Sequence, residues 1–358
     1  MNILLLTRYS RNGASSRLRA LQYIPYFKKA GWDVEVAPLF DDAYLDALYG
    51  KARGMGRVAR YYQARVALLL SRSQADIIWV EKEILPWVPC LFERLILPSG
   101  VPVVTDYDDA IFHNYDMSSN PVVRAILGRK IDRVMAASTV VVAGNAYLAE
   151  RARTAGAKQV VLVPTVLEAR SYGLANLALT NDKPVIGWIG SPSTWNGYAA
   201  PMMPLLISIA DSEAAMIRAV GAAQDAASDT MLEILPWSEE SEVSSIQSMD
   251  IGIMPLDDSP WAQGKCGYKL IQYMACGLPV VASPVGVNTK IVEHGVNGFL
   301  ASTEDEWREA LTTLLRDPDL RRRMGEAGRQ KVKDGYSLEV WGPRVTDLFR
   351  ETAKRSAM

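Results

Sequence analysis

The chain has 358 residues, of which 49% are hydrophobic, and its 39 basic side chains nearly balance its 40 acidic ones. This length predicts two domains, each able to bury a core, and the composition excludes a disordered chain. The near-neutral charge argues against a general nucleic-acid binder, which needs basic residues to neutralise phosphates. Three cysteines and two histidines form neither a disulfide framework nor a recognisable metal motif, so we expect no metal.

Short apolar runs alternate with helical patterns along the chain, which predicts parallel sheets covered by helices. In the first half we expect strands at Ile3–Leu6, Val34–Leu39, Ile77–Val80, Val101–Thr105, Val140–Ala143 and Val160–Val163. The expected helices between them include Ser16–Lys29, Pro121–Ala137 and Ala146–Ala155. After a break at 164–183, further strands are expected at 184–190, Met216–Val220, Glu233–Leu235, Ile251–Met254 and Val280–Ala282. The pattern predicts two tandem doubly wound α/β domains, with a site in a cleft at the carboxyl ends of the strands.

The loop after the first strand contains only Gly13 where a dinucleotide-binding protein has several glycines, which argues against an NAD-type oxidoreductase. It offers Ser15 and Ser16 as helix N-caps, followed by Arg17 and Arg19. Cations in a first helical turn oppose the macrodipole unless an anion or carboxylate lies nearby. The arginines are therefore either a solvated pair, or Arg17 contacts an anionic ligand.

The strongest local signal lies in residues 264–283, where glycines lead into a helix that Gly277 ends and a buried strand follows. Lys265, Lys269 and Gln272 are spaced to share one face of that helix. Backbone N–H groups at such a helix start bind anions. The pattern favours an anion pocket over a solvated helix face.

Residues 274–283 (Met-Ala-Cys-Gly-Leu-Pro-Val-Val-Ala-Ser) and 291–300 (Ile-Val-Glu-His-Gly-Val-Asn-Gly-Phe-Leu) resemble the donor domain of retaining GT-B glycosyltransferases of family 4. The resemblance implies an acceptor-binding domain over 1–170, a linker over 171–183 and a donor-binding domain over 184–337. It further implies that a last helix, 338–358, crosses back to the first domain. The expected reaction moves a sugar from a nucleotide-diphosphate-sugar to a saccharide with retention and without a metal or other cofactor, while the departing diphosphate helps to accept the acceptor's proton.

This chain departs from the family pattern at the paired glutamates, whose positions correspond to Gly264 and Gln272. The basic residues expected after the first donor-domain strand are also missing, and Gly190, Ser191, Ser193 and Thr194 stand there. We expect Lys265 and Lys269 to supply the lost positive charge, with Lys269 acting in catalysis. Gln272 can still hydrogen-bond a ribose hydroxyl, because an amide both donates and accepts.

Three carboxylates follow the strand Val101–Thr105, at a place where the family often has a His-Asp pair, matched here by Tyr107 and Asp108. Their mutual repulsion would raise a pKa or attract a hydroxyl-rich or cationic partner. Asp106 or Asp108 is therefore expected to accept a sugar hydroxyl in catalysis, the alternative being helix capping. His113 is either an acceptor contact or a structural histidine.

The remaining candidates come from the resemblance and from position. For the acceptor they are Gly13, Ala14, Ser15, Ser16 and Arg17, beside His113. For the donor they are Cys266, Gly267, Tyr268 and Asn288, with Asp258 in place of the first glutamate. Trp237 either flanks the nucleobase or is a packing residue.

Residues 51–72 contain Lys51, Arg53, Arg57, Arg60, Arg65 and Arg72 and no acid. A basic amphipathic helix in the acceptor lobe would suit an anionic membrane surface and a lipid-linked acceptor, unless its apolar face simply packs into the core. Basic residues also outnumber acidic ones in 1–180, whereas the reverse holds in 181–358. We expect a cytoplasmic protein. If the basic helix binds a membrane, the protein is expected to be peripheral at the inner face of the plasma membrane. It would take part in the synthesis of polysaccharides or glycoconjugates.

Two other functions fit the same pattern. A nucleotide-sugar-binding scaffold would have lost catalysis together with the paired glutamates. A GT-B nucleotide-sugar epimerase would convert the donor without any acceptor.

Overall fold

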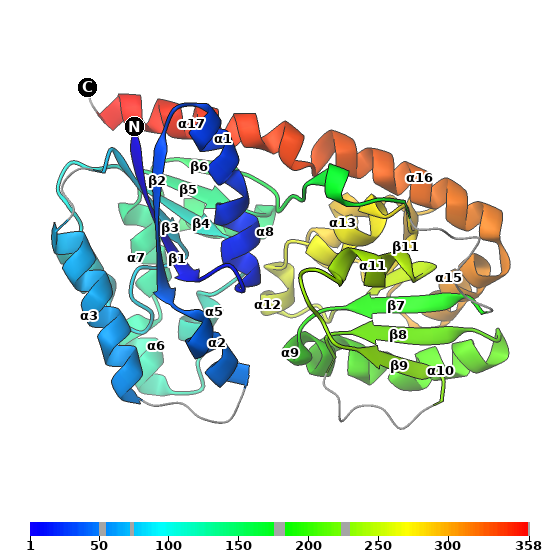
Figure 1. The fold of residues 1–358 in the computed structure, drawn as a ribbon. Coiled ribbons are helices and arrows are strands. Elements are labelled where there is room, and N and C mark those ends of the chain that lie inside the picture. Colours follow the sequence, from blue (N-terminus) through cyan, green and yellow to red (C-terminus); the bar gives the residue numbers. More distant parts are fainter. Residues whose placement is uncertain (50–54, 72–74, 175–182, 223–229, 357–358) are drawn as a thin grey trace. The chain divides into compact units, whose positions relative to one another are not determined.

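A computed structural model of the chain describes residues 1–49, 55–71, 75–174, 183–222 and 230–356 (Figure 1). The chain forms two compact units. The first contains Met1–Thr165, Gly264–Cys266 and Trp341–Met358, and the second contains Val166–Gln263 and Gly267–Val340. Among the described residues, no helix has both the length and the apolar character needed to cross a membrane.

The first unit is built on a parallel sheet of six strands in the order β2-β1-β3-β4-β5-β6. Each strand expected in the first half of the sequence is present. Their bounds are β1 (Asn2–Tyr9), β2 (Asp33–Phe40), β3 (Ile77–Glu81), β4 (Val103–Tyr107), β5 (Val140–Ala143) and β6 (Val160–Leu162). The order reverses between β1 and β3, and at such a switch point loops leave the sheet in opposite directions and make room for a ligand.

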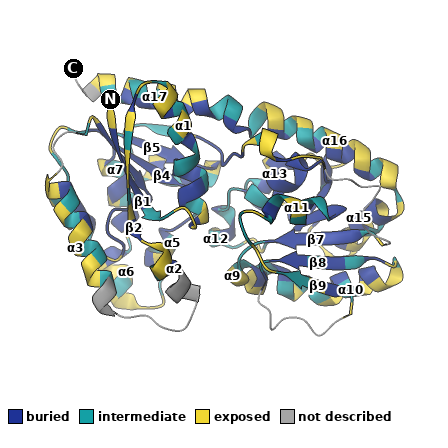
Figure 2. Cartoon of the chain, viewed as in Figure 1, coloured by how far each residue is buried: buried dark blue, intermediate teal, exposed yellow. Residues whose placement is uncertain are grey.

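Helices cover both faces of this sheet (Figures 1 and 2). They are η1 (Ser16–Ala20), η2 (Leu21–Tyr23), α1 (Ile24–Lys29), α2 (Asp42–Tyr49), α3 (Met55–Ser71), α4 (Cys90–Ile96), α5 (His113–Asp116), α6 (Pro121–Leu127), α7 (Lys130–Ala137), α8 (Ala146–Thr154) and α17 (Leu338–Ser356). The single helix expected over Pro121–Ala137 is wrong, since it divides into α6 and α7 around Gly128. A Cβ at Gly128 would stand 2.3 Å from the carbonyl oxygen of Arg124, so only glycine fits this turn.

The C-terminal helix α17 packs into the first unit through one aromatic side chain. The ring of Phe349 lies 4.8 Å from that of Trp79 on β3 and 5.1 Å from that of Phe27 on α1. All three side chains are essentially inaccessible to solvent. Because strand residues alternate between faces, Trp79 points to this face whereas Ile78 and Val80 point to the α3 face.

Helix α3 contains the described part of the segment predicted to be basic and amphipathic. Lys51, Arg53 and Arg72 lie outside the described residues, as does the side chain of Arg57. Leu69 is 2% exposed, and Tyr62 and Val66 pack against the same apolar cluster, so this face of α3 lies in the core. Arg65 is also buried and donates to the carbonyl oxygens of Thr7 and Ala37 at 2.9 and 2.8 Å. The packing agrees with the core-helix alternative for this face, and Arg65 is no surface cation.

The second unit contains another parallel sheet, in the order β12-β11-β10-β7-β8-β9. Its strands are β7 (Val185–Ile189), β8 (Met216–Val220), β9 (Leu232–Leu235), β10 (Ile251–Met254), β11 (Val280–Ala282) and β12 (Gly298–Leu300). The expected strands are confirmed, but β12 was not foreseen, because its three residues are too few to show a periodicity. β7 lies in the middle of the sheet, and its carboxyl end is the natural ligand position.

The strands of this sheet divide their apolar side chains between two cores. Ile186 and Trp188 of β7 face one core, and Val185 and Ile189 face the other. The helices around the sheet are η3 (Ala169–Ser171), α9 (Pro192–Thr194), η4 (Trp195–Ala199), η5 (Ala200–Met202), α10 (Met203–Ser212), α11 (Glu242–Gln247), α12 (Pro260–Gln263), α13 (Tyr268–Ala275), α14 (Asn288–Ile291), α15 (Glu304–Arg316) and α16 (Pro318–Gly335). α10 and α15 cover the first core, and α13 and α16 cover the second.

Candidate functional site

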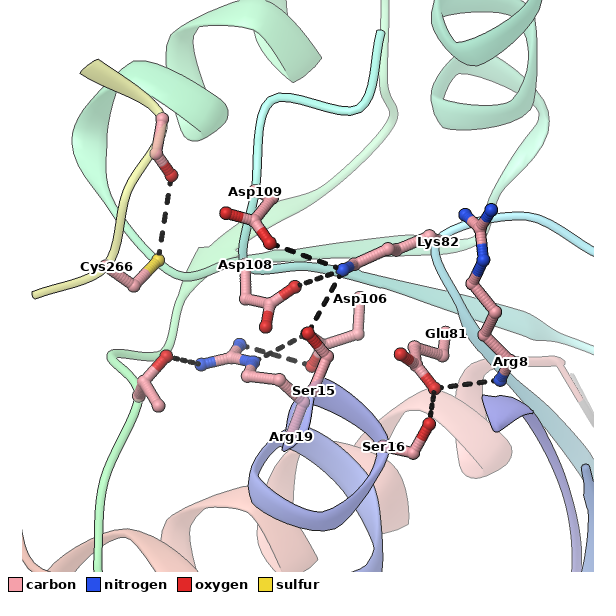
Figure 3. Close-up of polar contacts among 12 residues, drawn as sticks. Arg8, Ser15, Ser16, Arg19, Glu81, Lys82, Asp106, Asp108, Asp109 and Cys266 are labelled. Carbon is pink, nitrogen blue, oxygen red and sulfur yellow. Dashed lines mark hydrogen bonds and ion pairs between the residues drawn. The ribbon is translucent and has the colours of Figure 1, made fainter. Parts of the chain in front are cut away.

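The first cluster of candidate residues lies where β1, β3 and β4 end in the first unit (Figure 3). The parallel register places Glu81 of β3 beside Asp106 of β4, so two carboxylates meet at the sheet edge. Helix residues that follow β1 cover them. Ser16 donates to Glu81 at 2.5 Å, and the backbone N–H of Arg8 donates to the same carboxylate at 2.8 Å. Burial raises the pKa of Glu81.

The predicted N-cap role of Ser15 and Ser16 is wrong. The helical backbone already begins at Ala14, so both serines lie within its first turn. Their hydroxyls contact the charged side chains of Glu81 and Lys82 at the end of β3 instead of backbone N–H groups of their own helix. Gly13 is buried against Tyr9, and a Cβ there would stand 2.5 Å from the Tyr9 Cβ. Arg17 is 7% exposed, so no solvated arginine pair exists here.

Arg19 and Asp106 form a buried bidentate ion pair. Arg19 Nε donates to Asp106 Oδ1 at 2.8 Å and Nη2 donates to Oδ2 at 3.2 Å, while Nη1 donates to the carbonyl oxygen of Val163 at 2.8 Å. The two residues are 2% and 3% exposed. Burial raises the pKa of Asp106 to about 6 against the opposing effect of Arg19. Both carboxylate oxygens are occupied, so the prediction that Asp106 accepts a sugar hydroxyl does not fit this geometry.

Lys82 brings the other two carboxylates together. Its Nζ lies 2.8 Å from Asp108 Oδ1, 3.5 Å from Asp109 Oδ2 and 3.1 Å from Ser15 Oγ. Although burial disfavours both charges, each stabilises the other, so the pKa of Lys82 is raised and that of Asp108 is lowered. The side chains of Asp108 and Asp109 remain partly accessible, at 13% and 28% exposed. They are the carboxylates of this cluster that a sugar hydroxyl can reach.

Lys82 was missed in the sequence, although a signal was present. It directly follows the expected strand Ile77–Val80 within Glu81-Lys82-Glu83, and charged residues at a strand end are the same pattern that selected Asp106 and Asp108. Its positive φ of 67° is rare for a residue with a side chain. The turn directs the lysine back across the sheet edge toward Asp108.

Residues 264–266 belong to the first unit, and this changes the predicted lysine helix. α13 begins at Tyr268, so Lys265 precedes it and does not share a helix face with Lys269 and Gln272. Lys265 Nζ lies 3.4 Å from Asp109 Oδ1. Cys266 packs against Gly144, where a Cβ would stand 2.4 Å from its Sγ, and burial raises the pKa of its thiol.

Gly264 has a structural reason for lacking a side chain. A Cβ at this position would stand 2.5 Å from the Cβ of Ala110 and 2.8 Å from its backbone nitrogen. Such distances are shorter than any normal contact, and Ala110 immediately follows the Asp108–Asp109 pair. The loop after β4 therefore occupies the space that a glutamate at 264 would need.

His113 is a structural histidine. Its Nδ1 lies 2.8 Å from Asp116 Oδ1 and its Nε2 lies 2.9 Å from the Tyr147 hydroxyl, so both ring nitrogens have protein partners. This agrees with the structural alternative and not with an acceptor contact. Tyr107, which matches the family histidine, is fully buried in the core and reaches no solvent.

The second cluster lies at the carboxyl end of β7 in the second unit. Ser191 caps α9, and its hydroxyl lies 3.0 Å from that of Ser193 and 3.2 Å from that of Thr194. Lys269 Nζ donates to Thr194 Oγ1 at 3.4 Å and lies 4.5 Å from the centre of the Trp188 ring. A Cβ on Gly190 would stand 2.3 Å from the Lys269 Nζ, so glycine leaves room for the ammonium group. The structure thus brings together Gly190, Ser191, Ser193, Thr194 and Lys269.

Trp237 lies after β9 at the same edge. It is 37% exposed, and its Nε1 donates to Glu242 Oε2 at 2.9 Å. A Cβ on Gly221, which follows β8, would stand 3.1 Å from the Trp237 Cβ and 2.2 Å from the carbonyl oxygen of Gly190. The indole is therefore held in place close to the β7 end, with part of its surface open to solvent.

Gln272 has a different role from the predicted ribose contact. It is 3% exposed, and its Nε2 donates to the Tyr172 hydroxyl at 3.2 Å. That hydroxyl donates to Glu242 Oε1 at 3.1 Å and lies 3.3 Å from the Tyr268 hydroxyl. Gln272 thus supports a network that ends at Glu242, a carboxylate which the sequence analysis missed. Its signal was the run of acids after Trp237, at the end of an expected strand.

The remaining donor candidates lie in the loops around α13. Asn288 is fully buried and donates to the carbonyl oxygen of Ser283 at 3.0 Å, so it holds its own loop and faces no solvent. Gly267 precedes α13 with a φ of 67°, which glycine adopts without strain. Asp258 is exposed and accepts from the Gln263 side chain. Within the described part of the chain, no group of three or more His, Cys, Asp or Glu side chains is arranged to hold a metal ion.

Comparisons with known proteins give a partial family match and a match of fold. Residues 223–331 match the family model described as glycosyl transferases group 1. Over 75 residues the chain is 35% identical to N-acetyl-alpha-D-glucosaminyl L-malate synthase of Bacillus anthracis, and this segment covers 20% of this chain and 20% of that protein. The chain therefore spans about a fifth of the length of such curated relatives.

Two solved structures cover nearly the whole chain. Sucrose-phosphate synthase from Thermosynechococcus elongatus has a TM-score of 0.72 at 15% identity, with 98% of both chains covered. Anabaena HepE in complex with UDP-glucose has a TM-score of 0.72 at 16% identity, covering 98% of this chain and 100% of that one. At this level of identity the likeness shows the fold. The predicted fold class, GT-B with two tandem parallel-sheet α/β domains, is confirmed.

Proposed function

We propose that this chain is a retaining glycosyltransferase that moves a sugar from a nucleotide-diphosphate-sugar to a saccharide acceptor. The observation that carries the proposal is the cluster of Lys269, Thr194 and Ser191 at the carboxyl end of β7. An ammonium group beside hydroxyls is an arrangement that binds phosphates. The match of residues 223–331 to group 1 glycosyl transferases, which includes Lys269, supports the same assignment.

In this proposal the second unit binds the donor. Lys269 neutralises part of the charge of the diphosphate beside the hydroxyls of Ser191 and Thr194, and it stabilises the diphosphate most when that group leaves with its full charge. Trp237 stacks against the base, and the hydrogen bond to Glu242 fixes the orientation of the indole. The diphosphate leaves on the face that the acceptor approaches and takes the proton from the acceptor hydroxyl. No metal is required, because Lys269 supplies the positive charge.

The first unit binds the acceptor in this proposal. Asp108 and Asp109 accept hydrogen bonds from sugar hydroxyls, and Lys82 holds both carboxylates in position. The proposed acceptors include a lipid-linked saccharide. In that case the enzyme acts in the cytoplasm, at the inner face of the membrane. Synthesis of polysaccharides or glycoconjugates at the cell surface is the process that such an enzyme serves.

A donor panel tests the assignment. UDP-, GDP-, ADP- and CMP-sugars are added beside their free nucleotides, and the unfolding temperature is measured. A ligand at 100 times its Kd stabilises the folded state by about 2.7 kcal/mol, which is readily seen. Because Anabaena HepE was solved with UDP-glucose, we expect the uridine compounds to respond. The selected donor is then incubated with saccharide acceptors, and release of the nucleoside diphosphate is followed. No response to any nucleotide would contradict the proposal.

Two observations favour a second candidate, a nucleotide-sugar-binding scaffold without turnover. Gly264 has no room for a carboxylate, and Gln272 is buried beneath Tyr172. In that case the selected donor stabilises the protein, yet neither hydrolysis nor transfer occurs with any acceptor. An epimerase would be recognised by conversion of the donor sugar in the absence of an acceptor.

A further inference from the structure

Exposed large apolar side chains are concentrated in one part of the first unit. In the described chain thirteen such side chains are exposed, and seven of them lie between residues 87 and 126: Trp87, Leu91, Phe92, Leu95, Met117, Val122 and Ile126. Leu91 and Leu95 are 63% and 70% exposed and are one helical turn apart on α4. A soluble protein rarely leaves such a set uncovered unless a partner binds it.

These side chains belong to neighbouring elements. α4 packs between α3 and α7 in the helical layer over one face of the sheet. The Trp87 ring, just before α4, lies 5.0 Å from the Tyr115 ring of α5, and the Tyr115 hydroxyl accepts from the Trp87 N–H at 3.0 Å. α5 contacts α6, which carries Val122 and Ile126 one turn apart. The apolar side chains thus extend from α4 across α5 to α6.

Trp87 is held in an unusual way. It is 54% exposed, and its φ of 62° lies in the left-handed region that a large side chain rarely adopts. The surrounding structure therefore fixes a strained residue whose indole projects into solvent. Tryptophan has an apolar ring and a polar N–H, which suits the boundary between the headgroups and acyl chains of a bilayer.

The exposed charges on the helices around these residues are basic. Among the described side chains of α3, α4, α6 and α7 and the link between α6 and α7, the exposed ionisable groups are Arg60, Arg94, Arg124, Arg129 and Arg133. The acids of this region face inward or are paired. Glu93 is buried against Lys130, Asp132 accepts from Arg151 at 2.6 Å, and Asp116 of α5 lies 3.0 Å from Arg151 Nη2. Two copies of this chain meeting through this layer would bring arginines against arginines.

We propose that this layer docks on an anionic phospholipid bilayer, with Trp87, Leu91, Phe92 and Leu95 entering the interface and the arginines contacting lipid phosphates. We call the surface formed by these four apolar residues and Arg94 and Arg133 the docking face. Binding of this kind combines buried apolar area with attraction to anionic headgroups. It differs from the membrane segment expected at 51–72, because α3 directs its apolar face into the core. It deepens the proposed function, since a lipid-linked acceptor would be presented at such a surface.

Vesicle sedimentation of the full chain, without donor or acceptor, tests the proposal. We compare vesicles of phosphatidylcholine alone with vesicles containing about one third phosphatidylglycerol. The wild-type chain should bind the anionic vesicles and be released by added salt, and it should bind the neutral vesicles at least tenfold more weakly, on the order expected from several arginines. Failure to bind anionic vesicles overturns the proposal.

Two double variants locate the surface. Leu91→Gln with Leu95→Gln should weaken binding to anionic vesicles at least tenfold, since two large apolar side chains no longer enter the interface. The matched control, Leu162→Gln with Leu174→Gln, changes two exposed leucines elsewhere and should bind as the wild type does. Arg94→Gln with Arg133→Gln should weaken binding more than tenfold on anionic vesicles and not on neutral ones, at about fivefold per arginine.

The remaining outcomes are also decisive. The unfolding temperature of each variant is measured first, to show that it folds. The Arg94→Gln and Arg133→Gln double variant gives a second test, because it keeps all the apolar side chains of the docking face. If Leu91→Gln with Leu95→Gln binds vesicles as tightly as the wild type, the docking face is wrong. If the wild-type chain is a dimer and binds no vesicles, and if this variant is a monomer, the docking face binds a second copy of the chain. That result would overturn the proposal of a lipid partner. Nucleotide binding is measured on the same proteins. It tests the proposed function independently of vesicle binding, so failure of one proposal can be told from failure of the other.

Discussion

In the first unit the strands end among charges that neutralise one another inside the protein, whereas in the second unit they end among hydroxyls, an ammonium group and a partly exposed indole. Arg19, Asp106 and Lys82 are 2%, 3% and 6% exposed, but Trp237 is 37% exposed. Buried ion pairs are costly to separate, so they fix the loops that contain them. Partly exposed groups can exchange water for a ligand. The comparison assigns a structural role to the buried Arg19, Asp106 and Lys82 of the first cluster and a binding role to the second cluster.

A further buried network in the first unit strengthens this contrast. Lys130 Nζ lies 2.6 Å from Glu83 Oε2 and 3.0 Å from Glu93 Oε1, and all three side chains are at most 2% exposed. One ammonium group thus serves two carboxylates. Burial raises the pKa of Glu93 to about 7, although Lys130 opposes the shift. The interior of the first unit therefore contains a group that titrates near neutral pH.

The largest effect is expected from separating the Arg19–Asp106 pair. Arg19→Ala leaves a buried carboxylate without its partner, so the free energy of unfolding should fall by about 3–5 kcal/mol. Urea unfolding at pH 7 measures this. Arg19→Met with Asp106→Leu removes both charges and should recover most of the loss. If Arg19→Ala costs less than about 1 kcal/mol, which is typical of an exposed pair, the structural role of the Arg19–Asp106 pair is refuted.

The pH dependence of stability should change when Glu93 is replaced. The folded chain keeps the Glu93 proton up to about pH 7, whereas the unfolded chain releases it near 4.5. Between these values the folded state binds more protons, so Glu93 makes the free energy of unfolding decrease as the pH rises. Glu93→Gln removes this decrease. The difference in stability, variant minus wild type, should grow with pH across this window by up to about 3 kcal/mol. A difference that is constant from pH 5 to 8 would contradict the shifted pKa.

Lys269→Ala tests the binding role of the second cluster. Loss of a charge-assisted contact worth roughly 1.5–3 kcal/mol should weaken the binding of the nucleoside diphosphate tenfold to a hundredfold. The unfolding temperature without ligand should hardly change, because Lys269 is only partly buried. Lys290→Ala, an exposed lysine of the same unit, is the matched control and should bind normally. Isothermal titration measures each affinity, and an unchanged affinity for Lys269→Ala would remove the phosphate site from this cluster.

Gly264→Ala tests why a motif glutamate is absent. The added Cβ overlaps Ala110 in the first unit, and overpacking of this kind costs about 1–3 kcal/mol of stability. Gly197→Ala is the matched control, because a Cβ there has no neighbour within 4 Å and should leave stability nearly unchanged. Thermal unfolding compares the two. Equal stability of both variants would show that the loop after β4 can yield, and that a glutamate at 264 could be accommodated.

How far the sequence could predict these features depends on the range of the interactions. Strand ends were predictable, because buried parallel strands are continuous apolar runs, and Ser191, Thr194 and Lys269 were found beside them. The role of each charge was not predictable. Arg19 and Asp106 are 87 residues apart in the chain, and only the folded sheet shows that they pair.

The lysine helix illustrates the same limit at short range. The spacing of Lys265 and Lys269 fits one helix face, but Gly267 adopts a left-handed conformation and the helix begins after it. Lys265 then pairs with Asp109, far away in sequence. The role of His113 was likewise left open, and Gln272 was assigned to a ribose hydroxyl, because their protein partners, Tyr147 and Tyr172, cannot be inferred from local pattern. Polar residues near a strand end therefore identify a region more reliably than they identify a role.

The smallest expected effect separates the base from the phosphates within the second cluster. Trp237→Ala should weaken the binding of the selected nucleoside diphosphate about fivefold to tenfold, in the range of one lost base-stacking contact. The affinity for inorganic pyrophosphate should not change. Lys269→Ala should weaken both ligands, because pyrophosphate has the charge but no base. Trp237→Phe keeps an aromatic ring and should bind nearly as the wild type does, even though it cannot donate to Glu242. If Trp237→Ala instead lowers the unfolding temperature and leaves both affinities unchanged, the indole is a packing residue, and the base is recognised elsewhere in the second unit.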